Sequence, residues 1–117
     1  MGLVLWIDQN TFATGLLSKV FKKKNLSFYT IDNAENFIYL IDDLKPELLV
    51  LDSRTAMEFR EALEKQFSAS DSLRNLPVIQ IDECEDLPFL QRKIGMIKRP
   101  FDPFQIPSML EEILGAN

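Results

Sequence analysis

Aspartates follow three of the apolar runs in this chain, each at the point where the run stops. Asp8 follows Leu-Trp-Ile, Asp52 follows Leu-Val-Leu, and Asp82 follows Ile-Gln-Ile. Carboxylates can serve as nucleophiles in group transfer or as ligands of a hard divalent cation. Histidine is absent from the chain, which excludes Ser-His and Cys-His catalysis, histidine-rich metal sites and a histidine phosphocarrier. Aspartate chemistry is therefore the chemistry that this sequence offers.

A cluster of these acids would need a counter-charge. Two carboxylates ~6 Å apart repel each other by roughly 3 kcal/mol at an effective dielectric constant of about 20. A divalent metal, Arg99, Lys98 or protonation of one acid could offset this repulsion. Clusters that depend on a counter-charge are frequent at functional sites, whereas a single aspartate after a strand is equally typical of a helix cap or a turn.

Short apolar runs and helical periodicity alternate along the chain. The runs predict strands at residues 3–7, 27–31, 48–51, 77–81 and 94–97, and the strands at 3–7 and 48–51 are expected to be buried. The periodicity predicts helices at residues 12–21, 37–44, 56–67 and 106–114, the last of which begins near Asp102 or as late as Pro107. The polar stretch 68–75 is expected to be a connection. The segment 83–93, which Pro88 interrupts, is expected to hold one short or distorted helix.

This alternation predicts an α/β fold with helices on both faces of a parallel sheet. We expect a flavodoxin-like, doubly wound sheet of five strands in the order 2-1-3-4-5. Ligands of such sheets lie beyond the carboxyl ends of the strands, where the strand order reverses. Asp8, Asp52 and Asp82 would converge there, whereas Asp32, after the edge strand, is expected to cap the second helix.

Length and composition limit the classes of partner and location. The 117 residues suit a single domain over residues 1–117. The net charge of −5 argues against general attraction to nucleic acid or anionic membranes, and the basic run Lys22–Lys24 is expected at a helix end, where cations complement the dipole. One cysteine, Cys84, and no apolar stretch long enough to span a bilayer indicate a cytoplasmic domain.

Four segments resemble motifs of response-regulator receiver domains, the phosphoacceptor modules of two-component signalling. Val4–Asn10 resembles the first-strand motif, in which apolar residues precede an acidic pair. Lys45–Asp52 is similar to the third-strand motif, whose final aspartate accepts a phosphoryl group. Pro77–Ile81 resembles the fourth strand, and Arg99–Phe101 resembles the Lys-Pro-Phe that follows the fifth, where the proline is typically cis. The resemblance runs from Leu3 to about Leu114.

The resemblance implies a phosphotransfer site with Asp52 as the phosphoacceptor. Arg99 stands in place of the phosphate-binding lysine, and Asp82 stands in place of the Thr or Ser of the switch. A Mg²⁺ ion would offset the charge of the incoming phosphoryl group. The positions that the resemblance assigns to this metal are Asp8, Gln9, Asp52 and the backbone carbonyl of Arg54.

Several of these positions depart from the pattern of the family. Gln9 replaces the second acid of the pair and supplies no charge, so we expect weakened Mg²⁺ affinity. Asp82 cannot donate a hydrogen bond when it is ionised, and Met96 occupies the position of the aromatic switch residue. We hypothesise that Asp82 and Arg99 pair inside the site and hold one conformation without modification.

The sequence is compatible with two functions, and neither of them makes the chain an enzyme. The first is a phosphorylatable receiver of a phosphorelay; the second is a pseudo-receiver that works by phosphorylation-independent protein docking, and the altered positions favour it. Expected partners are a sensor histidine kinase or phosphotransfer protein and an output domain or docking protein. The alternative, a small Mg²⁺-dependent aspartyl-phosphate enzyme, would require an acidic residue at the position of Arg54. Phe89 and Phe101 lie near the usual output face, and core packing is the simpler expectation for both.

Overall fold

A five-stranded parallel sheet forms the centre of the computed structural model, which describes residues 1–117. Its strands are β1 (Val4–Ile7), β2 (Phe28–Ile31), β3 (Leu48–Asp52), β4 (Val78–Ile81) and β5 (Lys93–Ile97). They lie in the order β2-β1-β3-β4-β5. The predicted flavodoxin-like topology is therefore confirmed.

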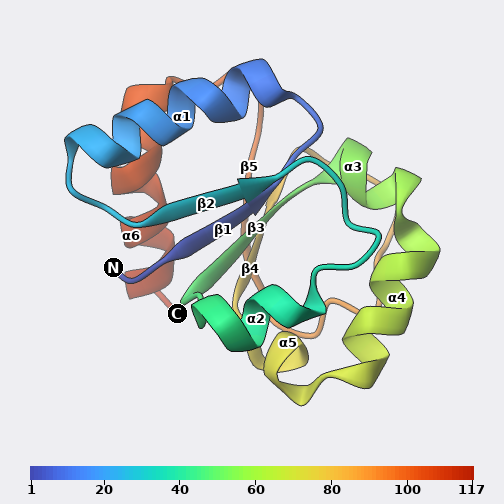
Figure 1. The fold of residues 1–117 in the computed structure, drawn as a ribbon. Coiled ribbons are helices and arrows are strands. Elements are labelled where there is room, and N and C mark those ends of the chain that lie inside the picture. Colours follow the sequence, from blue (N-terminus) through green and yellow to red (C-terminus); the bar gives the residue numbers. More distant parts are fainter.

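Helices cover both faces of this sheet (Figure 1). They are α1 (Thr11–Lys23), α2 (Ile38–Leu44), α3 (Ser53–Glu58), α4 (Arg60–Ala69), α5 (Asp71–Asn75), the short 3₁₀ helix η1 (Pro103–Gln105) and α6 (Ile106–Gly115). α1 and α6 lie on one face, and α2, α4 and α5 lie on the other. None of the helices has the length and apolar composition that crossing a bilayer requires.

The two faces of the central strands contribute to two separate cores. Trp6 and Val50 point into the cluster beneath α1 and α6, whereas Leu5 and Leu51 point into the cluster beneath α2, α4 and α5. Successive side chains of a strand alternate between faces, so a strand covered on both sides must be apolar at every position. β1 and β3 meet this requirement, since every residue of both is buried. Their carboxyl ends are thereby held rigidly side by side.

Phe12 is not part of the core, although its spacing predicted a place on the buried face of the first helix. Its side chain is 85% exposed, while Leu17, Val20 and Phe21 are buried. Phe12 precedes Leu17 by five residues, which places it about 140° around the helix axis from Leu17. The buried face of α1 is therefore built from the second half of the predicted pattern.

The prediction that Asp32 caps the second helix is wrong. α2 begins at Ile38, and no side chain of its own N-terminus caps it. Instead, Gln66 Oε1 from α4 accepts hydrogen bonds from the backbone N–H groups of Phe37 (2.7 Å) and Ile38 (3.1 Å). The amide group of Gln66 also donates to the carbonyl of Ala34 at 2.8 Å. A buried side chain from another helix thus satisfies donors that a helix start leaves unpaired.

The third predicted helix is broken, and the connection after it is partly helical. α3 begins directly after Asp52 and ends at Glu58, and Phe59, with φ −105° and ψ 24°, separates it from α4. α5 occupies part of the stretch expected to be a connection. It is capped by Ser70, whose hydroxyl accepts the N–H of Leu73 at 3.1 Å, and Leu73 is fully buried.

The short or distorted fourth helix predicted within residues 83–93 is absent. This segment, between β4 and β5, contains turns but no helix. Pro88 has no N–H to donate, and the apolar residues around it pack as an irregular chain. Leu87 is buried, and the ring of Phe89 lies 5.3 Å from that of Phe67. The face of the sheet beside β5 is therefore covered by a loop.

Candidate functional site

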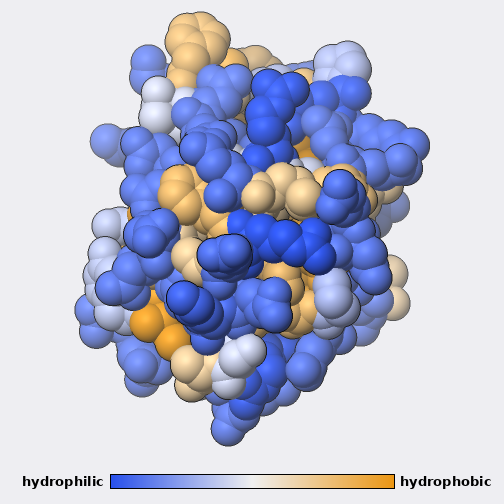
Figure 2. Space-filling view, turned by 90° about the vertical axis from the view of Figure 1, so that its right-hand side faces the viewer, coloured by the Kyte–Doolittle hydropathy of each residue, from blue (hydrophilic) through white to orange (hydrophobic).

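The three aspartates that follow the central strands line one open cavity of about 720 Å³. Asp52 ends β3, and Asp8 and Asp82 directly follow β1 and β4. These strands are neighbours in the sheet, so their carboxyl ends bring the three side chains together as predicted. Figure 2 views this end of the molecule, where hydrophilic side chains cover most of the surface around smaller apolar patches.

The guanidinium group of Arg99 contacts all three of these carboxylates. Nη2 donates to Asp8 Oδ2 at 2.9 Å, and Nη1 donates to Asp52 Oδ1 at 2.7 Å and to Asp82 Oδ2 at 3.0 Å. The expected pair of Asp82 and Arg99 is therefore present, and two further ion pairs accompany it. Arg99 precedes Pro100, and the peptide bond between them is cis.

Asp8 is the most deeply buried of the three acids, with 3% of its side chain exposed. Burial raises its pKa above the ordinary value of 3.8, and the negative charge of Asp52 acts in the same direction. The backbone N–H of Asn10 (2.9 Å) and the indole N–H of Trp6 (3.3 Å) donate to its two oxygens and partly oppose the rise. Burial thus makes Asp8 harder to keep ionised than an exposed aspartate.

Asp52 is the N-cap residue of α3, and both of its carboxylate oxygens are engaged. Oδ2 accepts the backbone N–H of Thr55 at 2.9 Å and the hydroxyl of Thr55 at 2.7 Å. Oδ1 accepts the hydrogen bond from Arg99. The hydroxyl oxygen of Thr55 in turn accepts the backbone N–H of Gln9 at 3.0 Å. Thr55 therefore joins the loop after β1 directly to the start of α3 and also holds the carboxylate of Asp52.

Asp82 occupies a left-handed backbone conformation, with φ 67°. The backbone N–H of Arg99 donates to its Oδ1 at 2.7 Å. This hydrogen bond is the main cause of a lowered pKa for Asp82, which slight burial opposes and the guanidinium group of Arg99 reinforces. The carbonyl of Asp82 also accepts the hydroxyl of Ser53, which itself accepts an N–H of the buried Gln80 at 3.2 Å.

Thr55 and Ser53 are two residues of this site that the sequence did not identify. Each bonds to one of the converging aspartates, Thr55 through the carboxylate of Asp52 and Ser53 through the carbonyl of Asp82. A signal for Thr55 was available, because a hydroxyl three residues after an N-cap aspartate can reach back to it. No comparable pattern marks Ser53, whose partner lies 29 positions further along the chain.

The positions that the resemblance assigns to a metal do not form a cation site in this arrangement. The amide of Gln9 donates to Glu58. Arg54 lies in the first turn of α3, where backbone carbonyls point along the helix toward its C-terminal end. Asp8 and Asp52 both accept hydrogen bonds from Arg99. No group of three or more acidic, histidine or cysteine side chains is placed to hold a metal ion, so these residues do not fit Mg²⁺.

The neighbours of Arg99 point away from the cavity or into the core. Lys98 pairs with Glu83 at 3.2 Å, and both side chains are exposed. Phe101 lies 6.4 Å from Trp6, ring to ring, and its packing role is confirmed, as is that of Phe89. Arg99 is therefore the basic residue of this segment that enters the cavity.

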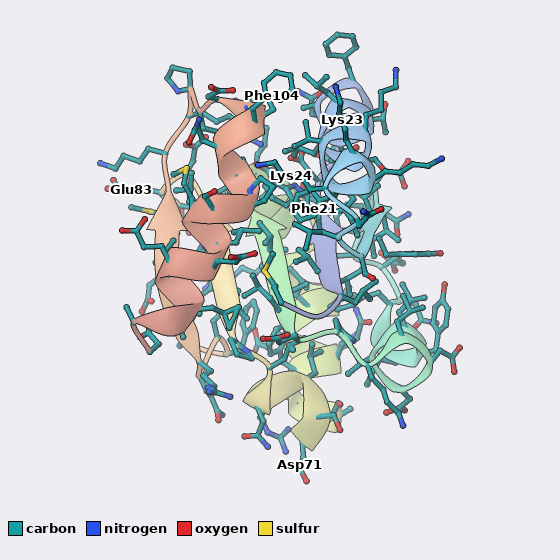
Figure 3. The ribbon with its side chains drawn as sticks, turned by 90° about the vertical axis from the view of Figure 1, so that its left-hand side faces the viewer. Phe21, Lys23, Lys24, Asp71, Glu83 and Phe104 are labelled. Atoms are coloured by element: carbon teal, nitrogen blue, oxygen red, sulfur yellow. The ribbon has the colours of Figure 1, made fainter.

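Exposed aromatic and basic side chains gather elsewhere, around the end of α1. Figure 3 shows Lys23 and Lys24 at this end, close to Phe104 from η1. The ammonium group of Lys24 donates to the carbonyl of Phe104 at 3.4 Å, and the Phe104 side chain is 59% exposed. α1 ends at Lys23, so the basic run lies at a helix end as predicted.

Comparison with known proteins identifies the fold. No protein-family model matches the sequence, and no curated protein sequence matches it. A response regulator from Desulfuromonas acetoxidans superposes with a TM-score of 0.78 at 13% identity, over 99% of this chain and 98% of that one. A response regulator receiver modulated diguanylate cyclase from Pelobacter carbinolicus gives 0.70 at 21% identity, over 99% and 94%.

A third structure adds a metal to the comparison. The receiver domain of the sensor histidine kinase PA1611 from Pseudomonas aeruginosa PAO1, with a magnesium ion coordinated in its active site cleft, gives a TM-score of 0.74 at 11% identity. The match covers 98% of this chain and 99% of that one. At such identities the likeness establishes that the chain has the fold of receiver domains. The chemistry of the site has to be argued from its own residues.

Proposed function

We propose that this chain is a signal-transduction module of the receiver type that acts by docking to a protein partner and does not accept a phosphoryl group. The observation that carries this proposal is the engagement of Asp52. Both carboxylate oxygens of this residue already accept hydrogen bonds, from Thr55 on one side and from Arg99 on the other. The position that would accept a phosphoryl group is thus a structural cap.

Phosphoryl transfer to Asp52 would weaken these bonds, because the carboxylate loses its negative charge when it becomes an acyl phosphate. The attacking oxygen also needs a lone pair aimed at the phosphorus and a cation that offsets the charge of the incoming group. Hydrogen bonds to charged groups are worth about 1.5–3 kcal/mol each, and Oδ1 receives one from Arg99 at 2.7 Å. The weakening of these bonds adds to the free-energy cost of phosphorylation.

Asp82 is a second obstacle to phosphorylation. Its lowered pKa keeps it ionised at neutral pH, so it offers the incoming phosphoryl oxygens a negative charge where the receiver pattern has a hydroxyl donor. Its carboxylate also holds Arg99 through two hydrogen bonds. The cation that would grip a phosphoryl group is therefore already paired.

The fold and the surviving positions support a protein partner from two-component signalling. The solved structures with the same fold are response regulators, a receiver-modulated diguanylate cyclase and the receiver of a sensor histidine kinase. By analogy with them, partners of this chain would be a kinase, a phosphotransfer protein, an output domain or a docking protein. A module that holds one conformation would transmit its signal by binding to the partner protein, without a change in its own structure.

The test is a titration with beryllofluoride, a phosphoryl mimic, in the presence of millimolar Mg²⁺. Trp6 reports on the pocket directly, because its indole N–H is bonded to Asp8. We expect no change in Trp6 fluorescence or in the amide spectrum of the folded wild-type chain. A saturable response that Asp52→Ala abolishes would overturn the proposal.

A gain-of-function variant serves as the positive control for the absence of a beryllofluoride response in the wild type. Asp82→Ser combined with Arg99→Lys restores the receiver pattern, and serine suits the left-handed backbone at φ 67° better than a β-branched threonine. We expect this variant to respond to beryllofluoride. Asp86→Ser is the matched control, since Asp86 is an exposed acid of the same segment, and it should stay silent.

A further inference from the structure

We infer that Arg99 is a built-in cation that occupies the place of both the divalent metal and the phosphate-binding lysine of receiver sites. The inference rests on the proposed function and deepens it, because it names what keeps the site inactive. The fold suggests a Mg²⁺ ion in this cavity, but the residues that line the cavity do not fit one.

Every carboxylate oxygen of Asp8 and Asp52 already receives a hydrogen from a donor. Asp8 Oδ1 accepts from Asn10, and Asp8 Oδ2 accepts from Trp6 and Arg99. The two oxygens of Asp52 accept from Thr55 and Arg99. A divalent cation binds through lone pairs that point at it, and here donated hydrogens already occupy one lone pair of Asp8 Oδ1 and of Asp52 Oδ1 and both lone pairs of each Oδ2.

Arg99 is the donor whose withdrawal would change this arrangement most. Its guanidinium group donates one hydrogen bond to each of the three acids, whereas the other donors of Asp8 and Asp52 belong to the adjoining strand, loop and helix. The guanidinium cation supplies one positive charge to three carboxylates. Its removal would leave three neighbouring acids with no cation bonded to them, and Arg54, which also lines the cavity, would be the remaining positive charge. Such a cluster favours the binding of a cation from solution.

The position of Arg99 is fixed from several sides. Its backbone N–H is bonded to Asp82 Oδ1, and its guanidinium carbon lies 6.0 Å from the centre of the Phe101 ring. Burial works against the charge of Arg99, but the hydrogen bonds that it donates to Asp52 and Asp82 and the nearby carboxylates outweigh burial and raise its pKa. A metal from solution would have to displace a cation that the chain itself holds in place.

The amide of Gln9 also contributes to the exclusion of a metal. A glutamine side-chain oxygen can bind a hard cation, but the amide nitrogen of Gln9 donates to Glu58 and its backbone N–H donates to Thr55, and these two bonds hold Gln9 against α3. The loop after β1 is therefore tied to α3, with Arg99 between Asp8 and Asp52. The pocket is closed to divalent cations by contacts within the chain.

The test is a titration with Mn²⁺, which replaces Mg²⁺ at oxygen sites and broadens nearby nuclear magnetic resonance signals. The signals to follow are the Trp6 indole and the Asn10 amide, both of which donate to Asp8. For the wild type we expect no saturable broadening at millimolar Mn²⁺. For Arg99→Ala we expect saturable broadening and an affinity at least about tenfold above any residual wild-type binding. Addition of Asp8→Asn should abolish this gain.

Two further variants make the result decisive. Lys98→Ala removes the same charge from the adjacent residue, which pairs with the exposed Glu83 and with none of the three aspartates, and it should behave as the wild type. Arg99→Lys serves if Arg99→Ala does not fold, because lysine keeps the charge but cannot bridge three carboxylates, and it should gain binding as well. Saturable Mn²⁺ binding by the wild type, or a folded Arg99 variant with no gain, would overturn the inference.

The outcome separates this inference from the proposed function. Wild-type Mn²⁺ binding without a beryllofluoride response would refute the built-in cation and leave the phosphorylation-independent module standing. A beryllofluoride response that depends on Asp52 would refute the module itself.

Discussion

Arg99 is joined to Asp82 twice, once from its side chain (Nη1 to Oδ2, 3.0 Å) and once from its backbone (N to Oδ1, 2.7 Å). The first contact alone would be an ordinary ion pair on a half-exposed carboxylate. The second fixes the chain at the end of β5 to the residue that follows β4, so the guanidinium group is aimed at Asp8 and Asp52. The acid pocket and its counter-charge are thus one unit.

The pKa values of Asp8 and Asp82 should lie on opposite sides of the ordinary value of 3.8. Burial raises the pKa of Asp8, and the hydrogen bond from the Arg99 backbone lowers that of Asp82. Carbon chemical shifts of the two side chains, followed from neutral to acidic pH, measure both values. In Arg99→Met the pKa of Asp82 should rise toward 3.8 but stay below it, since the backbone donor remains. Equal values for the two residues in the wild type would contradict the geometry.

Asp82→Asn should lower the free energy of unfolding at pH 7 by less than about 1 kcal/mol, because the side chain is 39% exposed. Asparagine tolerates the left-handed backbone, so strain should not add to the loss. The lowered pKa of Asp82 means that its ionised form stabilises the fold above the unfolded value of 3.8, and that this contribution is lost as the pH falls through the folded value. Urea denaturation should therefore find the difference at pH 7 and almost none near pH ~2. A difference that grows on acidification would contradict the assignment.

Thr55→Val should destabilise the fold by about 1–3 kcal/mol, since it removes the hydroxyl that bonds Asp52 and the N–H of Gln9 and leaves the latter without its partner. Thr55→Ser keeps the hydroxyl and is the matched control. Denaturant unfolding of both variants measures the difference. If serine and valine cost the same, the methyl group and not the hydrogen bonds would be responsible.

Phe12→Ala should change the free energy of unfolding by no more than about 0.5 kcal/mol, because its side chain is 85% exposed. Phe21→Ala, nine positions further along the same helix, should cost about 3–5 kcal/mol, because Phe21 is fully buried and stacks on Phe28 at 4.5 Å. Thermal unfolding of the two variants gives the comparison. A large loss for Phe12→Ala would place its ring in the core.

The sequence was sufficient for the sheet and for the meeting of the acids, since both follow from apolar runs that each end at an aspartate. It also predicted that Asp82 and Arg99 pair. It did not predict that the same guanidinium group reaches Asp8, because β3 and β4 lie between β5 and β1 and the length of a side chain decides the contact.

The remaining errors have the same origin in contacts that are distant along the chain. Gln66 caps α2 from another helix. No local sequence pattern predicts this cap, because Gln66 lies 28 and 29 residues from the two backbone N–H groups that it accepts. The segment around Pro88 has apolar residues that suggested a helix, yet packing of Phe89 on Phe67 holds it as an irregular chain. Tertiary contacts override local propensity at these positions.

The most direct test of the central claim is the intact mass of the wild-type chain after incubation with Mg²⁺ and a small-molecule phosphodonor. The engagement of Asp52 by Thr55 and Arg99 predicts no phosphoryl adduct. The variant Asp82→Ser/Arg99→Lys, treated in the same way, should acquire one. A stoichiometric adduct on the wild type that disappears in Asp52→Ala would contradict the account.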